Sequence, residues 1–149
     1  MEKRETNRSG RLIHTFREQL TKEWTNEQEI RNRIAMAKIV FNNKKRILCS
    51  RMKLDLRKRL VKSFVWSVLL YGSETWMMRK RNKNSIEALE MWIWKRMEGI
   101  KWIDKISYEE VFKKIKERRI LLRVIKKRKG NWIGHILRGN GLQTSVLKG

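Results

Sequence analysis

The residues that most often catalyse reactions are few in this chain and lie far apart in sequence. The only aspartates are Asp55 and Asp104, and no Asp-Asp pair occurs. Two-metal phosphoryl transfer needs carboxylates that hold two cations about 4 Å apart. The glutamates sit beside Lys or Arg on expected helix faces, where a surface ion pair is the ordinary explanation. Taken alone, the chain is therefore not expected to be an enzyme.

Metal and cofactor sites are not expected either. Zinc takes about four Cys, His, Asp or Glu ligands, whereas Cys49, His14 and His135 are isolated from one another. His135 is expected to pack or to hydrogen-bond beside Trp132. The segment Gly139–Gly141 does not match a phosphate-binding loop. A single cysteine forms no disulfide within the chain, which excludes a secreted disulfide scaffold.

Positive charge is the main functional signal. The 149 residues contain 38 Lys and Arg against 15 Asp and Glu, a formal net charge of +23. Because such a surplus disfavours the compact state unless polyanions screen it, nucleic acid is the expected partner. An anionic membrane is the alternative, but the apolar run Phe64–Tyr71 is far shorter than the ~20 residues that span a bilayer. Without a visible signal segment in Met1–Gly10, we expect a nuclear or cytoplasmic protein that is not secreted.

Two basic segments form the predicted nucleic-acid-binding surface. Between Lys113 and Lys129 lie ten Lys and Arg residues and one acid, Glu117. Exposed faces normally mix both signs, so this imbalance indicates phosphate contacts. The second segment is Arg57–Lys62. The predicted contact residues are Lys116, Arg119, Arg123, Lys126, Lys127, Arg128, Lys129, Arg57, Lys58 and Lys62.

The elements that must position these side chains are helices. The absence of proline and the abundance of helix formers predict an all-α fold, and the length favours one domain with a modest core. A capping box at Thr25–Gln28 predicts a first helix to about Cys49. A second helix is predicted over 54–71 and ends at Gly72. The polar tract Arg79–Asn84 is expected to be a loop.

Three more helices complete an expected set of about five with short loops. The capping pattern at Asn84–Glu87 opens the third, and that at Ser107–Glu110 opens a short fourth. The fifth is expected from about Arg119, with its basic run 126–129 near a helix end, where cations complement the helix dipole. A break is expected at Gly130-Asn131. Residues 139–149 are expected to form a frayed tail.

Apolar spacing also predicts the core. In the second helix, Phe64 and Val68 lie one turn apart and are expected to be buried against the helix that holds Trp92. Tryptophan can stack on bases, but at helical spacing among Leu and Ile it is more often a core residue. Trp66, Trp92 and Trp94 are therefore assigned to the core.

Several ordered motifs then resemble one known region. Leu69–Trp76 looks like the end of a helix that follows the palm in reverse transcriptases of non-LTR, LINE-type retrotransposons. The similarity continues through Leu89–Met97, Ile100–Asp104 and Trp132–Arg138. Upstream, Glu29–Ala37 looks like the element before the thumb. The resemblance covers about residues 27–149, whereas residues 1–26 do not match.

This resemblance implies a thumb-like helical domain and its C-terminal extension. In the complete enzymes the thumb packs on the palm and grips template–primer duplex, which agrees with the basic faces. The catalytic aspartates of that family lie in a palm motif that this chain does not have, so no catalytic residue carries over. The expected function is sequence-independent binding of RNA–DNA hybrid or duplex. The alternatives are an interaction module that self-associates through its former palm-facing apolar surface, and a relic without function.

Overall fold

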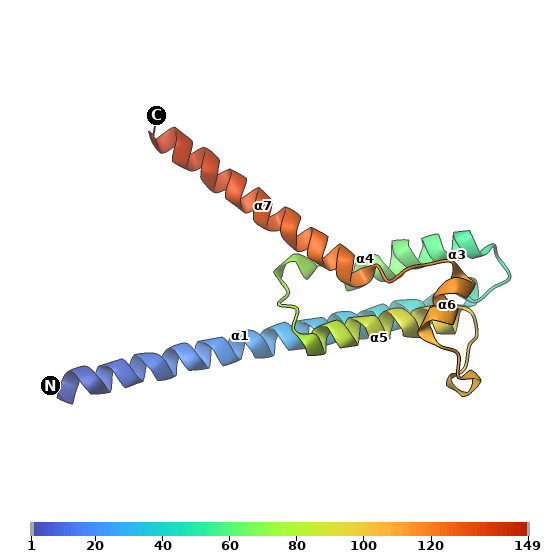
Figure 1. The fold of residues 1–149 in the computed structure, drawn as a ribbon, viewed down its shortest axis with the longest axis horizontal. Coiled ribbons are helices and arrows are strands. Elements are labelled where there is room, and N and C mark those ends of the chain that lie inside the picture. The colour runs from blue at the N-terminus through green and yellow to red at the C-terminus, as the bar shows by residue number, and fades with distance from the viewer. Residues whose placement is uncertain (1, 149) are drawn as a thin grey trace.

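The computed structural model is helical, which confirms the all-α prediction (Figure 1). The structure describes the backbone of residues 2–148 and the side chains of residues 7–101 and 103–139; within these limits there is no strand. Five α-helices have seven residues or more. In chain order the elements are α1 (Glu2–Asn43), α2 (Lys45–Leu48), α3 (Leu54–Leu60), η1 (Val61–Trp66), α4 (Ser67–Leu69), η2 (Ser73–Thr75), α5 (Lys80–Met97), η3 (Trp102–Asp104), α6 (Tyr108–Ile115) and α7 (Leu121–Lys148).

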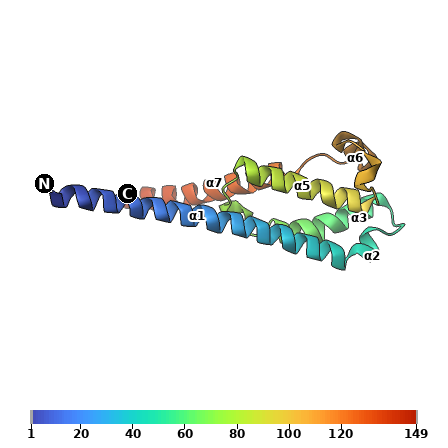
Figure 2. The ribbon, with the colours of Figure 1, turned by 90° about the horizontal axis from the view of Figure 1, so that it is seen from below.

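The molecule has a helical body from which two long helices project. The second half of α1, the rod formed by α3, η1 and α4, and α5 pack together, and α6 and the start of α7 close the body (Figures 1 and 2). The first half of α1 and the second half of α7 leave the same end of the body and diverge (Figure 1). The body therefore holds the core, and the described side chains of the two projecting segments, residues 7–22 and 131–139, are mostly exposed.

Tryptophans and aliphatic side chains fill the core. Trp66 and Trp94 are buried and meet edge to face, with ring centroids 5.8 Å apart, as predicted for both. Trp92 is only half-buried, because it lies at the edge of the core with its ring 5.5 Å from that of Phe41. The largest fully buried side chains are Trp76, Trp94, Phe41, Ile30, Leu48, Leu69, Ile86, Leu89, Ile93, Ile115, Leu121 and Ile125.

The predicted capping box at Thr25 is wrong. The Thr25 hydroxyl donates to the carbonyl of Thr21 at 2.8 Å inside a continuous α1, a bond to the preceding turn that a threonine hydroxyl makes as readily as a cap. The boundary between residues 26 and 27, where the resemblance begins, falls within this helix. α1 ends at Asn43, and the short α2 carries the chain on to Cys49.

The predicted second helix is present, but the register of its apolar face differs. The segment Val61–Trp66 is a π-helix, whose wider turn rotates the side chains that follow. Val61, Val65 and Leu69 therefore point into the core, while the Phe64 residue is 42% exposed. The prediction that Phe64 is buried is wrong. Gly72, with φ +75°, ends the rod in the left-handed conformation that its sequence predicts.

The polar tract Arg79–Asn84 is not a loop, because α5 begins at Lys80. Asn84 is therefore inside a helix and is no cap. Asn82, which is buried, donates from Nδ2 to the carbonyl of Met77 at 2.9 Å. The chain just before α5 thus satisfies the buried amide of Asn82. The cap at Ser107 is confirmed, since its hydroxyl accepts the backbone N–H of Glu110 at 3.3 Å.

The break predicted at Gly130-Asn131 is absent, and α7 continues to Lys148. A glycine inside a helix costs only about 1 kcal/mol relative to alanine, and the good helix formers Lys126–Lys129 precede this one. The predicted start at Arg119 is also too early, since α7 begins at Leu121. Within the predicted frayed tail, the side chains of residues 140–149 lie outside the described residues.

Candidate nucleic-acid interface

A buried carboxylate fixes the start of the most basic helix. Glu90, on α5, is 1% exposed, and its Oε1 accepts the backbone N–H of Ile120 at 3.0 Å, immediately before α7. Burial raises the pKa of Glu90, and the backbone hydrogen bonds from Ile120 and Leu121 together with the charge of Arg119 oppose that rise. Glu90 therefore acts as a cap supplied from another helix. Sequence reasoning missed this role, because the glutamate resembles a member of a surface ion pair.

Two cations of the run 126–129 bond to the body. The guanidinium of Arg128 donates to the carbonyl of Leu70 at 3.2 Å, and Nζ of Lys129 donates to the carbonyl of Trp76 at 3.0 Å. Both carbonyls belong to the turn around Gly72, so these side chains hold α7 against the end of the rod. The run does not lie at a helix end, since α7 extends well beyond it. The prediction that these cations complement the negative end of a helix dipole is therefore wrong.

Three other cations of α7 are exposed. Arg123, Lys126 and Lys127 lie within about one turn of the helix, and none has an ion-pair partner among the residues that the structure describes. Residues 118–149 contain nine Lys and Arg and no Asp or Glu. The start of α7 is therefore a face of a single charge sign.

A groove of about 550 Å³ runs beside this face, between α7 and the segment that leads into α5. Its apolar lining comes from three side chains, two of them half-buried and one buried. Its polar lining comes from four cations, and no acid of the described chain lines it. The lining residues are Met78, Lys83, Leu122, Arg123, Ile125, Lys126 and Lys129.

Helical spacing in the sequence predicts that Lys116, Arg119, Arg123 and Lys127 lie near one face, but the structure does not form this face. Lys116 ends α6 in a left-handed conformation, with φ 55°. Arg119 lies before α7, pairs with Glu87 at 3.4 Å and rests over the ring of Tyr108 at 5.5 Å. Only Arg123 and Lys127 belong to one helix, one turn apart, because the chain between α6 and α7 is not helical.

The other predicted segment is mostly paired with acids. Arg57 lies 3.3 Å from Glu98, and Lys58 lies 3.3 Å from Glu117, which also meets Lys62 at 2.9 Å. Lys58 is only 9% exposed. These contacts tie the rod to the end of α5 and to the chain after α6, so the charges of Arg57 and Lys58 are largely neutralised within the protein.

Sequence reasoning assigned no contacts to a second cationic region, which surrounds α2 at the far end of the body. Its members are exposed and have no ion pair within the described part of the chain. A cavity of about 820 Å³ adjoins it, and its lining includes cations, Trp92 and the acid Glu98. The run of three basic residues after Asn43 was the available signal. The exposed cations are Lys44, Lys45, Arg46, Arg51 and Lys53.

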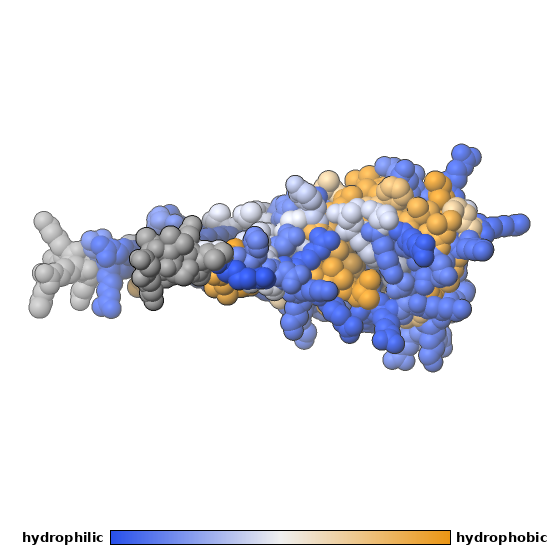
Figure 3. Space-filling view, turned by 90° about the horizontal axis from the view of Figure 1, so that it is seen from above, coloured by the Kyte–Doolittle hydropathy of each residue, from blue (hydrophilic) through white to orange (hydrophobic). Residues whose placement is uncertain are grey.

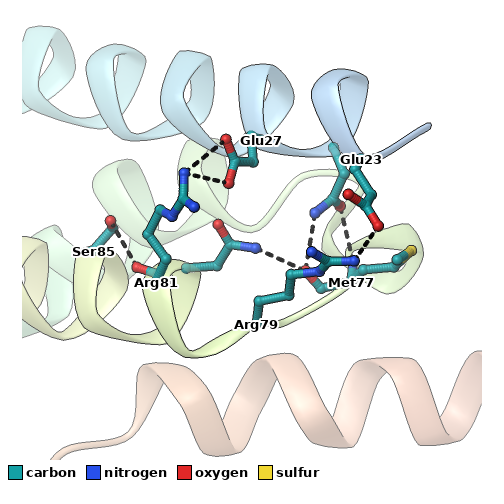
Figure 4. Close-up of polar contacts among 8 residues, drawn as sticks. Glu23, Glu27, Met77, Arg79, Arg81 and Ser85 are labelled. Atoms are coloured by element: carbon teal, nitrogen blue, oxygen red, sulfur yellow. Dashed lines mark hydrogen bonds and ion pairs between the residues drawn. The ribbon is translucent and has the colours of Figure 1, made fainter. Parts of the chain in front are cut away.

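Polar contacts fix α1 where it leaves the body (Figure 4). Glu23 pairs with Arg79, and Glu27 pairs with Arg81 at 3.1 Å. Between them, the amide of Asn26 exchanges two hydrogen bonds of 2.9 Å with the backbone of Met77. The acids of α1 in this region are therefore used to hold the start of α5.

The outer part of α1 carries an exposed apolar stripe, whose last two members, Leu20 and Trp24, line a hollow with Met77, Arg79 and Arg81 of the body. Its side chains recur at spacings of three and four residues, so they lie on one face of the helix. Their residues are 49–68% exposed. A second group lies on α7, on residues 41–63% exposed. The first group is Leu12, Ile13, Phe16, Leu20 and Trp24, and the second is Trp132, Ile133, Ile136 and Leu137.

His135 is exposed on this part of α7, as is Trp132, so neither takes part in the core. Across the body, apolar surface appears between hydrophilic side chains (Figure 3).

Within the described residues, no three His, Cys, Asp or Glu side chains are grouped so as to hold a metal ion. None of the described helices combines the length and the hydropathy of a membrane span. No protein-family model matches the chain, and no curated protein and no solved structure is significantly similar to it.

Proposed function

We propose that this chain binds nucleic acid without regard to sequence, through the exposed cations at the start of α7. The observation that carries the proposal is the single charge sign of this face. Arg123, Lys126 and Lys127 are exposed and unpaired in the described structure, on a segment with no acid from residue 118 onwards. A solvated helix face normally mixes both signs, so ordinary solubility does not account for it.

Phosphates are the anions that suit such a face. Contacts from Lys and Arg to phosphate oxygens position a protein on nucleic acid but carry no sequence information. The proposed ligand is an RNA–DNA hybrid or another duplex. In this proposal the chain corresponds to the thumb-like region of a non-LTR retrotransposon reverse transcriptase and has no polymerase activity by itself. The order and spacing of the motifs from residue 29 to residue 138 support that origin.

Salt-dependent binding tests the proposal. Removal of one phosphate contact should flatten the slope of log K against log salt by about 0.9 for B-form DNA, so the triple variant R123Q/K126Q/K127Q should flatten it by about 2.7. Affinity for every duplex sequence should fall to a similar extent. A control variant that removes the same charge is R11Q/R17Q/K22Q, because these three side chains are exposed on the outer part of α1. If both variants change the slope equally, the face on α7 is not the binding surface.

Self-association is the second candidate function, and the exposed apolar stripe on α1 favours it. A helix face with Phe16, Leu20 and Trp24 on its surface is typical of an interaction site. Sedimentation at high salt is the appropriate measurement, since apolar association persists when charges are screened. A monomer at every salt concentration would exclude this candidate, and L20E should dissociate any oligomer that forms.

A further inference from the structure

The groove beside α7 indicates a more specific ligand than a duplex surface. Resting on the proposed function, we propose that this groove holds an unpaired nucleotide at the end of a duplex. The base would lie on the apolar floor, and its phosphates would meet the cationic rim. The feature that carries the inference is the combination of apolar floor and acid-free cationic rim in one groove.

The floor is apolar and accessible. Ile125 is buried at its base, while Met78 and Leu122 are half-buried and present side-chain atoms to the groove. An unpaired base offers two apolar faces to such a floor, and a methionine thioether makes favourable contacts with aromatic rings. A base within a stacked duplex offers only its edge in the grooves. The floor therefore suits a base that has left the stack.

The rim matches the charge of a nucleotide. Lys83 approaches from α5, while Arg123 and Lys126 approach from α7. Lys129 also lines the groove, and because it spends one N–H on the carbonyl of Trp76, it keeps two for a ligand. Four cations without an acid are complementary to consecutive phosphates. They attract a polyanion and would repel a cationic peptide helix.

The size of the groove favours one or two nucleotides. Sites for small ligands occupy about 300–1,000 Å³, and this groove measures about 550 Å³. Its walls are also held in place, since Glu90 caps the start of α7 and Arg128 bonds to the carbonyl of Leu70. The binding site is therefore formed before a ligand arrives, which lowers the cost of ordering it.

Binding to matched probes tests the inference. A blunt DNA duplex and the same duplex with a short thymidine overhang are compared by fluorescence anisotropy on the full chain. We expect the overhang to bind about tenfold more tightly, in line with the contribution of a base that stacks on a protein surface. The variant M78Q/L122Q makes the floor polar without changing its charge. It should bring the two probes to equal affinity and leave blunt-duplex binding unchanged.

A control variant is M36Q/I39Q, which replaces two exposed apolar side chains on α1 and should keep the preference for the overhang. Equal affinity of the wild-type chain for both probes would overturn the inference while leaving the proposed function intact. Absence of salt-dependent binding to either probe would overturn the proposed function itself. The inference also fails if M78Q/L122Q still binds the overhang probe more tightly than the blunt duplex. It fails too if this variant loses only its binding to phosphatidylserine vesicles, because the groove would then bind a lipid.

Discussion

Replacement of Glu90 tests whether one buried carboxylate holds α7 against the body. Glu90→Ala leaves the backbone N–H of Ile120 without its partner at 3.0 Å. An unsatisfied buried donor costs about 1–3 kcal/mol, and we expect the free energy of unfolding to fall by about that amount. Glu90→Gln keeps a side-chain oxygen that can accept the same N–H, and it removes the cost of burying a charge. We therefore expect Glu90→Gln to be at least as stable as the wild type at pH 7.

The pH dependence has a definite sign. Burial raises the pKa of Glu90 above its usual value of 4.5, so the folded state holds this proton more tightly than the unfolded state does. The contribution to stability is fully present below pH 4.5 and is lost as the pH rises through the raised pKa. A glutamine has no such proton. The free energy of unfolding of the wild type, minus that of Glu90→Gln, should therefore fall with rising pH across this window and then level off.

Urea denaturation of the wild type and the two variants across this pH range provides the measurement. The amide hydrogen exchange of Ile120 and Leu121 reports locally on the same cap, and it should accelerate in Glu90→Ala. Two results would refute the reasoning. One is that Glu90→Gln is as unstable as Glu90→Ala, which would mean that the negative charge itself is needed. The other is that the free energy of unfolding of the wild type, minus that of Glu90→Gln, increases with rising pH.

Three further predictions concern the burial of Phe64 and Leu69, the conformation of Gly72 and the incorporation of nucleotides. Phe64→Ala should cost about 1 kcal/mol because the residue is 42% exposed, whereas Leu69→Ala, at a fully buried residue, should cost about 2–5 kcal/mol; equal effects in urea denaturation would contradict the register given by the π-helix. Gly72→Ala should cost about 1–2 kcal/mol, because φ is +75° there, and an unchanged melting temperature would oppose this. The purified chain should not incorporate deoxynucleotides with Mg²⁺ or Mn²⁺, because no three His, Cys, Asp or Glu side chains of the described residues are grouped so as to hold an ion; incorporation above a buffer control would refute that prediction.

Local patterns predicted the features that depend on neighbours in sequence. The Ser107 cap needs only a hydroxyl and a free N–H three residues later, and the structure contains it. Gly72 ends the rod because its conformation requires glycine. Burial of Trp66 and Trp94 follows from helical spacing among aliphatic residues. In each case the relevant partners lie within about one or two turns of helix.

The errors arose where one pattern admits two conformations. A threonine hydroxyl caps a helix or bonds to the preceding turn, and at Thr25 it does the latter. Apolar spacing fixes the buried face only in a regular helix, so the π-helix turns Phe64 outward. A glycine can end a helix or lie inside one at a cost of about 1 kcal/mol, and α7 continues through Gly130. Glu90 could not be recognised at all, because its partner lies thirty residues away along the chain.

The net charge divides into cations that the fold uses and cations that remain free, and this division predicts the salt dependence of binding. Of the ten predicted contact residues, four pair with acids and two bond to carbonyls, which leaves four whose side chains have no hydrogen-bond or ion-pair partner in the described structure. Four phosphate contacts correspond to a slope of log K against log salt of about −3.6 for B-form DNA, whereas ten would give about −9. A measured slope near −9 would mean that the paired cations leave their partners or that the region around α2 also meets phosphates. Removal of Lys44, Lys45 and Arg46 would distinguish the two, since only the second explanation predicts that this removal flattens the slope. The four free residues are Lys116, Arg123, Lys126 and Lys127.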